Sequence, residues 1–286
     1  MKIDGYTRMA AVVANPIKHS LSPFIHNLAF DLTDENGVYL AWEVESKKLA
    51  AIVENVRNLD MYGLNISMPY KGEIIKFMDE LSPAVELIGA VNTVVNHSGK
   101  IIGHNTDVIG FFNSLKKYDF KIENKQMLVL GGGGAAIALI AQAALSGAKK
   151  IVVAARKSAS YDPLNEKLAK LSAKTGVEIL LTDLSGADRL QKELNQTDLL
   201  VNATSVGMYG ASFPLEKSLL LPDKLLVVDA IYKVRETPFL HWAKEQGAQT
   251  ENGLGMLIGQ AAESFYLWTG KEMPVDKITL EMEREV

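Results

Sequence analysis

The sequence predicts an α/β protein made of two α/β domains. Short strand-like runs alternate with longer helical runs along the whole chain. There are two such series, and a glycine-rich turn opens the second. This alternation indicates mostly parallel sheets with helices on both faces. A length of 286 residues, 48% of them hydrophobic, is enough for two ordinary domains.

The first series begins with a predicted strand at 8–14. A helix follows that opens at Ser22-Pro23 and runs to about Leu32, because proline is favoured at the first position of a helix. The further elements that we expect are strands at 39–45 and 63–68, helices at 47–59 and 73–79, and a hairpin of 90–97 with 100–105 over the Ser98-Gly99 turn.

A helix at 108–118 comes directly after Asp107 and marks the boundary between the two series. The second series then consists of strands at 127–131, 150–156, 177–183, 199–204 and 225–232, with helices at 135–145, 163–175, 188–194 and 238–246. A last helix at 255–270 has apolar residues at helical spacing, and we expect it to pack back on the first series. The first domain should therefore comprise 1–106 with 253–286, and the second 107–252.

Composition excludes several classes of function. Charged residues make up 22% of the chain, the net charge is −4 and there is no basic stripe, so we expect no nucleic-acid partner. The absence of cysteine excludes disulfides, thiolate metal sites and a cysteine nucleophile. No metal is expected, because no metal-ligand spacing joins the histidines, which are His19, His26, His97, His104 and His241. Apolar stretches are too short for a signal peptide or a membrane span, which predicts a cytoplasmic protein with no membrane partner.

The turn after the strand at 127–131 has the pattern Gly131-x-Gly133-x-x-Ala136 between a strand and a helix. This is the dinucleotide fingerprint in its expected context, where a helix N-terminus can receive a pyrophosphate. The alternative is a tight turn that binds nothing. The next strand ends in Arg156 and Lys157 with no acidic residue. Two cations favour NADP, with NAD as the second choice, although both side chains could also be solvated surface cations.

The stretch NISMPYK, 65–71, reads as a buried strand that proline stops just before Lys71. Ligands of open α/β sheets lie outside the carboxyl ends of the strands, so Lys71 is placed to handle a proton. Asp107, just before the boundary helix, could keep this amine protonated and fix its direction. The alternative is a solvated salt bridge at the surface.

Several motifs occur in an order that resembles the shikimate dehydrogenase family over residues 11–274. They are NPIKHSLSP, NISMPYK, GAVNTVVN, GHNTDVIG, LGGGGAA, NATSVGM, DAIY with TP, and GLGMLIGQAAESFYLWTG. The resemblance implies a substrate-binding domain, 1–106 with 253–286, and a Rossmann domain, 107–252. It implies a catalytic lysine and its aspartate partner at Lys71 and Asp107, and a cofactor site at Gly131, Gly132, Gly133, Gly134, Ala135, Ala136, Arg156, Lys157, Thr204, Met208, Tyr232 and Gly253.

For the substrate, the resemblance implies that Ser20 and Ser22 bind a carboxylate, although Ser22 could also act simply as an N-cap. It implies that Asn92 and Gln260 hold ring hydroxyls, and that Tyr39 and Ser67 line the pocket. The implied reaction is NADPH-dependent reduction of 3-dehydroshikimate to shikimate, in aromatic amino-acid biosynthesis. A homodimer is one expected state of the chain.

The chain departs from the family pattern in ways that keep rival functions open. Ser67 with Tyr39 resembles the quinate/shikimate branch, which accepts either substrate and sometimes either cofactor. The branch's acidic residue is Ser158 here, and Tyr232-Lys233-Val234 replaces the family's Tyr-x-Pro. The rivals are therefore a broader quinate/shikimate dehydrogenase and, from another class, a non-enzymatic dinucleotide-binding sensor.

Overall fold

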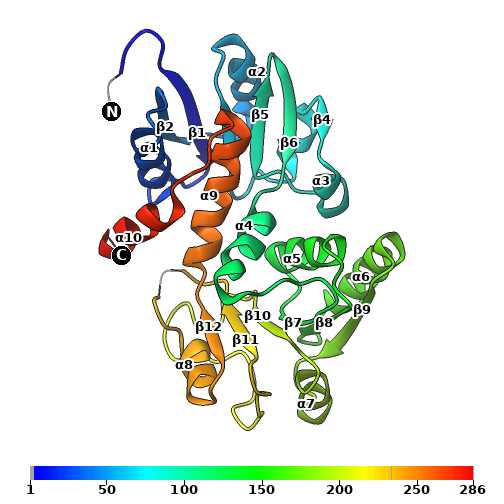
Figure 1. The fold of residues 1–286 in the computed structure, drawn as a ribbon. Coiled ribbons are helices and arrows are strands. Elements are labelled where there is room, and N and C mark those ends of the chain that lie inside the picture. Colours follow the sequence, from blue (N-terminus) through cyan, green and yellow to red (C-terminus); the bar gives the residue numbers. More distant parts are fainter. Residues whose placement is uncertain (1–2, 233, 286) are drawn as a thin grey trace. The chain divides into compact units, whose positions relative to one another are not determined.

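A computed structural model describes residues 3–232 and 234–285, so the departure at Lys233 lies outside the described residues. The chain forms two compact units, and each is an α/β domain (Figure 1). Unit 1 comprises Met1–Gly110 and Ile258–Val286, and unit 2 comprises Phe111–Leu257. The boundaries expected from sequence fall a few residues before these divisions. The predicted fold class, two α/β domains, is confirmed.

Unit 1 is built on a six-stranded mixed sheet with the order β2-β1-β3-β5-β6-β4. Its strands are β1 (Arg8–Ala14), β2 (Gly37–Glu43), β3 (Gly63–Ile66), β4 (Glu80–Leu81), β5 (Thr93–His97) and β6 (Lys100–His104). β1 runs parallel to both β2 and β3, whereas β5 is antiparallel to β3 and to β6. From β1 the chain goes first to β2 on one side and then to β3 on the other, so the strand order reverses between β1 and β3. Because β1 and β3 are parallel neighbours, their carboxyl ends lie together at this reversal.

The helices of unit 1 are α1 (Ser22–Leu32), α2 (Leu49–Asn58), α3 (Pro83–Ile88), α10 (Val275–Glu285), the start of α4 (Asp107–Ser114) and most of α9 (Leu254–Thr269). Short 3-10 turns occupy Ser46–Lys48 and Glu73–Phe77. The helix expected at 73–79 is therefore a 3-10 turn that stops at Phe77. It stops because Met78 is extended and the Asp79 N–H donates to the Ile101 carbonyl.

Unit 2 is built on a six-stranded parallel sheet with the order β12-β11-β10-β7-β8-β9. Its strands are β7 (Gln126–Leu130), β8 (Lys150–Ala155), β9 (Glu178–Asp183), β10 (Leu199–Asn202), β11 (Leu226–Asp229) and β12 (Gln249–Glu251). This is the doubly wound order of dinucleotide-binding sheets, and the order reverses between β7 and β10. Ligands of such sheets bind at that reversal.

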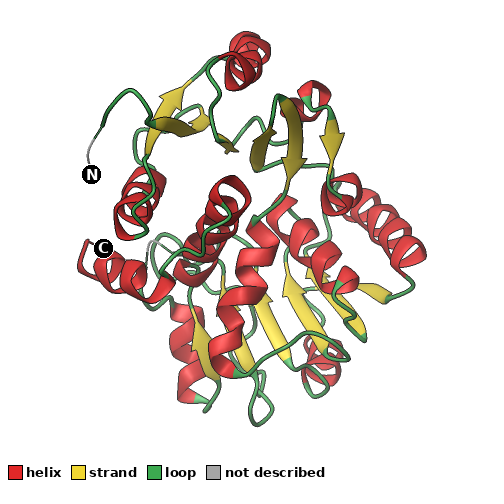
Figure 2. Cartoon of the chain, turned by 45° about the horizontal axis from the view of Figure 1, so that its top comes forward, coloured by secondary structure: helices red, strands yellow, loops and turns green. Residues whose placement is uncertain are grey.

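The helices of unit 2 include α5 (Gly134–Leu145), α6 (Tyr161–Thr175), α7 (Ala187–Leu194) and α8 (Pro238–Glu245), and a 3-10 turn at Leu115–Tyr118 continues α4. Figure 2 shows helices packed against the strands of this sheet. The core strands β7 and β10 are buried along their whole length, as expected for strands covered on both faces.

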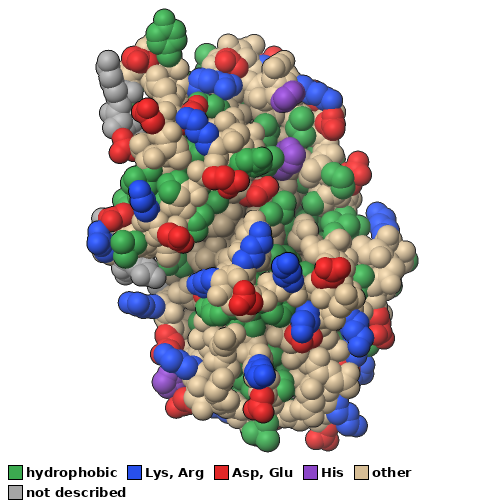
Figure 3. Space-filling view, in the orientation of Figure 1, with side chains coloured by type: hydrophobic (Ala, Val, Ile, Leu, Met, Phe, Trp, Pro, Cys, Tyr) green, Lys and Arg blue, Asp and Glu red, His purple; other side chains and the backbone are tan. Residues whose placement is uncertain are grey.

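Within residues 3–232 and 234–285, no helix has the length and apolar character that a membrane span requires. The same described residues contain no cluster of histidine and acidic side chains able to hold a metal ion. On the face drawn in Figure 3, Lys and Arg side chains are interspersed with Asp and Glu, which agrees with the small net charge of −4.

Candidate functional site

The loops after β1 and β3 start side by side at the strand reversal of unit 1. The Ser67 N–H donates to the Val13 carbonyl at 3.0 Å, and the Asn15 N–H donates to the Met68 carbonyl at 3.3 Å. One loop leads to the predicted carboxylate-binding serines and the other to Lys71. The reversal therefore brings the starts of these two predicted site segments to one edge of the sheet.

The turn that carries Lys71 is anchored by its neighbour Tyr70. β3 ends at Ile66, and the Tyr70 N–H then closes a turn on the Ser67 carbonyl at 3.0 Å. The Tyr70 ring is buried in the core of unit 1, and its hydroxyl donates to the Val44 carbonyl. The Lys71 carbonyl accepts from the Val91 N–H at 2.8 Å. With its backbone fixed in this way, Lys71 projects a side chain that is 26% exposed.

Lys71 and Asp107 form an ion pair, with Lys71 Nζ 2.6 Å from Asp107 Oδ2. The predicted contact between these side chains is confirmed, and their catalytic role stays a prediction. Asp107 is the first residue of α4, where the helix dipole favours a negative charge. Its side chain is 22% exposed, so the pair is neither a fully solvated surface bridge nor a sealed one. Such a pair can still meet a ligand.

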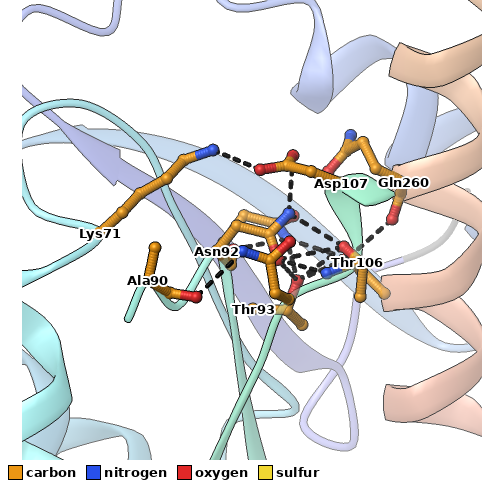
Figure 4. A network of polar contacts seen from close by, with 10 residues as sticks. Lys71, Ala90, Asn92, Thr93, Thr106, Asp107 and Gln260 are labelled. Atoms are coloured by element: carbon orange, nitrogen blue, oxygen red, sulfur yellow. Dashed lines mark hydrogen bonds and ion pairs between the residues drawn. The ribbon is translucent and has the colours of Figure 1, made fainter. Parts of the chain in front are cut away.

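Asn92 holds the other oxygen of this carboxylate. Asn92 Nδ2 donates to Asp107 Oδ1 at 2.9 Å, and Asn92 is only 2% exposed (Figure 4). Gln260 on α9 is 9% exposed, and Figure 4 draws its side chain on the same side of the network as Asp107. The structure brings Lys71, Asp107, Asn92 and Gln260 into one region of unit 1. Their predicted contacts with ring hydroxyls stay predictions.

The predicted serines lie at the start of α1. This helix begins at Ser22, with Leu21 in the N-cap position, so the alternative in which Ser22 is simply an N-cap is wrong. The Ser22 N–H donates to Ser20 Oγ at 3.2 Å, which holds the two serines together. Ser20 and Ser67 are half-buried and keep part of their surface accessible. Hydroxyls beside a helix N-terminus can receive an anion.

Tyr39 is buried next to Ser22, and its predicted place in the lining of the substrate pocket stays a prediction. It is 1% exposed, its ring stacks on His26 at 4.2 Å, and its hydroxyl donates to Asn65 Oδ1 at 2.7 Å. Burial raises the pKa of the Tyr39 hydroxyl well above its ordinary value, against a smaller lowering by Ser22. The hydroxyl therefore stays protonated and acts as a fixed donor inside unit 1.

The glycine turn of unit 2 fits a pyrophosphate. Gly131 has φ of +106°, and a Cβ there would lie 2.8 Å from Thr204 Cγ2. A Cβ on Gly132 would lie 2.2 Å from Leu164 Cδ2. By contrast, a Cβ on Gly133 or Gly134 would meet none of the described atoms within 4 Å, so the space above the start of α5 is open. The first amides of a helix have no partner within the helix, so they are available to a ligand bound there.

The residues after β8 fit a phosphate next to the ribose. Arg156 and Lys157 are exposed, and Lys157 Nζ lies 3.8 Å from Asp183 Oδ2, too far for a strong ion pair. Ser158 and Ser160 follow, with their hydroxyl oxygens 2.9 Å apart. This donor set suits the 2′-phosphate of NADP.

The loops after β10 and β11 are shaped by a buried carboxylate that sequence reasoning missed. Asp229 is fully buried and accepts from Asn202 Nδ2 at 3.1 Å, the Ile231 N–H at 3.1 Å and the Thr237 hydroxyl at 2.7 Å. The Thr204 hydroxyl donates to Asn202 Oδ1 at 2.7 Å. These bonds define the segments that carry the predicted cofactor residues.

Among those residues, Met208 and Tyr232 are half-buried. The Gly253 N–H donates to the Ile231 carbonyl at 3.0 Å, and a Cβ on Gly253 would lie 2.3 Å from the Ala230 carbonyl oxygen. Gly253 is thus required for close packing of the segments after β11 and β12. Its predicted contact with the cofactor is untested.

Four further buried polar residues near Asn92 were missed as well. They are Asn65, Thr93, Thr106 and Ser264, all at most 5% exposed and hydrogen-bonded to one another. A signal existed for Asn65, which interrupts an otherwise apolar strand, and for Ser264, which follows Gln260 by one helical turn.

Two family models match the chain. The shikimate dehydrogenase substrate binding domain matches residues 12–94, and the shikimate 5′-dehydrogenase C-terminal domain matches residues 253–279. The NADP(+) shikimate dehydrogenases of Lactococcus lactis subsp. cremoris MG1363 and subsp. lactis IL1403 are 98% and 86% identical to this chain, each over the full length of both proteins.

Solved structures agree with these relatives. A crystal structure of shikimate 5-dehydrogenase from Listeria monocytogenes, in complex with shikimate and NAD, superposes with a TM-score of 0.94 at 42% identity. The match covers 99% of this chain and 98% of that one. Together with the ordered motifs and the doubly wound sheet of unit 2, these similarities show that the chain belongs to the shikimate dehydrogenase family.

Proposed function

We propose that this chain is an NADP-dependent oxidoreductase that interconverts 3-dehydroshikimate and shikimate. The observation that carries the proposal is the Lys71–Asp107 pair, 2.6 Å apart and partly exposed at the carboxyl-end edge of the unit 1 sheet. It lies in a chain whose relatives, at up to 98% identity, are named shikimate dehydrogenase (NADP(+)). A partly exposed ammonium held by a carboxylate is suited to proton transfer with a substrate oxygen.

Lys71 donates a proton to the carbonyl oxygen of the substrate during reduction and recovers it from the hydroxyl during oxidation. Bound NADPH supplies the hydride. Asp107 fixes the direction of the ammonium group, and its own carboxylate is held by Asn92. Because oxidation releases a proton, alkaline pH favours that direction by mass action.

The other site assignments follow the family resemblance. Ser20 and Ser22 bind the substrate carboxylate at the start of α1, and their hydrogen bond to one another supports a shared role. Gln260 and Ser67 face the ring hydroxyls, and Asn92, which the resemblance assigns the same task, contributes through Asp107, to which its amide donates. In unit 2, the amides of the glycine turn hold the pyrophosphate, and Arg156 with Lys157 holds the 2′-phosphate. The open space above Gly133 and Gly134 supports this part of the proposal.

A substrate panel crossed with both cofactors tests the proposal. Shikimate and quinate are each assayed with NADP and with NAD, and kcat/KM is compared. We expect shikimate with NADP to give the highest value. Equal values for quinate would instead make the chain a quinate/shikimate dehydrogenase, as Ser67 allows. Nucleotide binding without turnover of either substrate would make it a sensor. Cytoplasmic location and a homodimer remain our predictions, and gel filtration tests the second.

A further inference from the structure

Behind Asn92, three buried hydroxyls form a closed cluster that we call the hydroxyl triangle. It consists of Thr93, Thr106 and Ser264, each 0% exposed. The oxygen of Thr93 lies 3.0 Å from that of Thr106 and 2.9 Å from that of Ser264, and the last pair is 3.0 Å apart. The three residues come from β5, the residue before α4, and α9. The triangle thus joins three elements of unit 1.

The rear of the triangle is closed by polar groups with fixed roles. Asn65 Nδ2 donates to Ser264 Oγ at 3.0 Å and to Thr93 Oγ1 at 3.1 Å. Asn65 Oδ1 accepts the Tyr39 hydroxyl, so this amide has a defined orientation. The Ser264 hydroxyl donates to the Gln260 carbonyl at 2.9 Å. Buried polar groups that are all paired in this way form a rigid unit.

The Thr106 backbone N–H and the hydroxyls at the front of the triangle together set the orientation of the Asn92 amide. Asn92 Oδ1 accepts from the Thr106 backbone N–H at 2.7 Å and from the Thr93 hydroxyl at 3.0 Å. A backbone N–H can only donate, so the oxygen of the amide must face it. The NH2 group then faces Thr106 Oγ1 at 3.0 Å and Asp107 Oδ1 at 2.9 Å. A rotated amide would set two donors against each other.

We propose that the hydroxyl triangle is a positioning device for the Lys71–Asp107 pair, acting through Asn92. It fixes Asn92 so that its NH2 group engages Asp107 Oδ1, which leaves Oδ2 to Lys71 (Figure 4). With both oxygens engaged, the carboxylate cannot rotate and the ammonium keeps one direction. Thr93, Thr106 and Ser264 are thus positioning residues, and their effect on turnover rests on the proposed function.

Two substitutions at Thr106 separate this role from packing. Thr106→Val keeps the shape of the side chain and removes the hydroxyl, whereas Thr106→Ser keeps the hydroxyl and removes a methyl group. We expect Thr106→Val to lower kcat for shikimate by about 10–100-fold, since small misplacement of catalytic groups has effects of this size. Thr106→Ser should stay within about 3-fold of the wild type, and KM for NADP should be unchanged in both. If Thr106→Ser is the more damaged variant, the proposal is overturned.

Thr182→Val is the matched control. Thr182 lies on β9 in unit 2 and is 1% exposed, and its hydroxyl has no hydrogen-bond partner among the described residues. The chemical change is the same as in Thr106→Val, but no hydrogen bond is lost. We expect kcat and KM of Thr182→Val to match the wild type. A fall in kcat equal to that of Thr106→Val would contradict a specific role for the triangle.

Crystal structures of the wild type and of Thr106→Val give a readout that does not depend on the substrate. We expect the Asn92 amide to shift in the variant, because it loses the Thr106 hydroxyl as acceptor, and we expect the distances from Asn92 Nδ2 to Asp107 Oδ1 and from Lys71 Nζ to Asp107 Oδ2 to lengthen. Unchanged geometry would overturn the positioning role even if shikimate turnover is as proposed. If the wild type does not oxidise shikimate, the proposed function fails, and the two structures still decide whether the triangle positions the pair.

Discussion

Asn92 in unit 1 and Asn202 in unit 2 each donate a hydrogen bond to an aspartate, but the two aspartates have opposite surroundings. Asp107 is 22% exposed on its side chain and meets the Lys71 ammonium. Asp229 is fully buried, and the groups of Asn202, Ile231 and Thr237 that donate to it are neutral. The same pair of residue types thus builds a partly open, charged site in one unit and a sealed, neutral support in the other.

This difference follows from the free-energy cost of burying a charged carboxylate, which Asp229 bears and the partly exposed Asp107 largely avoids. Burial raises the pKa of Asp229, and the bonds from Thr237, Ile231 and Asn202 only partly oppose it. A sealed carboxylate of this kind is suited to holding loops in place. The Lys71–Asp107 pair keeps contact with solvent, where a substrate can replace water. We therefore expect substitutions in the first pair to change catalysis and substitutions around Asp229 to change stability.

Lys71→Ala should have the largest effect on turnover. Loss of a positioned proton donor lowers rates by about 10²–10⁴-fold, so we expect kcat to fall by that factor. The free energy of unfolding should change by less than about 1 kcal/mol, because partly exposed ion pairs add little stability. Steady-state kinetics and urea denaturation measure the two quantities.

Lys76→Ala is the control for this variant. Lys76 is 61% exposed and lies 3.6 Å from Glu73 in the neighbouring 3-10 turn. Both kcat and stability should match the wild type. If Lys71→Ala also kept the wild-type kcat, Lys71 would have no part in proton transfer.

Asp229→Ala should have the largest effect on stability. It leaves Asn202, Ile231 and Thr237 without their buried acceptor, and an unpaired buried donor costs about 1–3 kcal/mol. We expect the free energy of unfolding to fall by about 3 kcal/mol or more. Urea denaturation followed by circular dichroism measures it. Asp162→Ala, in the exposed first turn of α6, should cost less than about 1 kcal/mol, and equal losses would refute the structural role of Asp229.

Arg156→Ala should separate ligand binding from stability within unit 2, because it removes an exposed charge that we expect to bind a ligand, whereas Asp229 supports the fold. A charge-assisted bond to a phosphate is worth about 1.5–3 kcal/mol, so KM for NADP should rise by about 10–100-fold. KM for NAD, which lacks the 2′-phosphate, should change by less than about 3-fold. Lys170→Ala, an exposed cation on α6, serves as the charge-matched control. A parallel rise for both cofactors would show that Arg156 does not read the phosphate.

Most of the fold could be predicted because strand and helix periodicity are local. The ends of the strands could not be predicted, since they depend on hydrogen bonds between side chains and the backbone. The strands expected at 199–204 and 225–232 stop at Asn202 and Asp229. In each case a side-chain oxygen of the last strand residue captures the backbone N–H two positions later, at Thr204 and at Ile231. The short elements β4, β12 and α3 lack the length for a recognisable period.

The site divides in the same way. The pairing of Lys71 with Asp107 could be predicted because Lys71 follows a recognisable strand and Asp107 stands at the start of a recognisable helix. The hydroxyl triangle could not, since Ser264 meets Asn65 and Thr93 across 199 and 171 residues of sequence. Tyr39 shows the converse limit. Its position matches a pocket-lining residue of the family, but its stacking on His26 and its bond to Asn65 arise from packing that no local pattern of the sequence encodes.

Acid should weaken unit 1 through His26. This residue is fully buried, and burial lowers its pKa from 6.5 to about 3, an effect that Asn65 only partly offsets. As pH falls, the imidazole therefore binds a proton near pH 6.5 in the unfolded chain but only near pH 3 in the folded chain. Stability from this group is complete above pH 6.5 and is lost as pH falls toward 3. Between pH 7 and 5 the loss should be about 2 kcal/mol, measurable by urea denaturation of the wild type and of His26→Phe.

His26→Phe keeps an aromatic ring against Tyr39 and removes the titrating group. Between pH 7 and 5, the free energy of unfolding of this variant should therefore fall by about 2 kcal/mol less than that of the wild type.

Asp229 works in the opposite direction in unit 2. Because its pKa is raised, its contribution to stability is present at acidic pH and is lost as pH rises through the folded value. Hydrogen exchange can be measured at pH 7 and pH 5 and corrected for intrinsic rates. Between these pH values, the protection of α1 and β2 should fall by more than the protection of β10 and β11. Equal losses in both units, or the same pH dependence in His26→Phe, would mean that the buried imidazole does not set the acid response of unit 1.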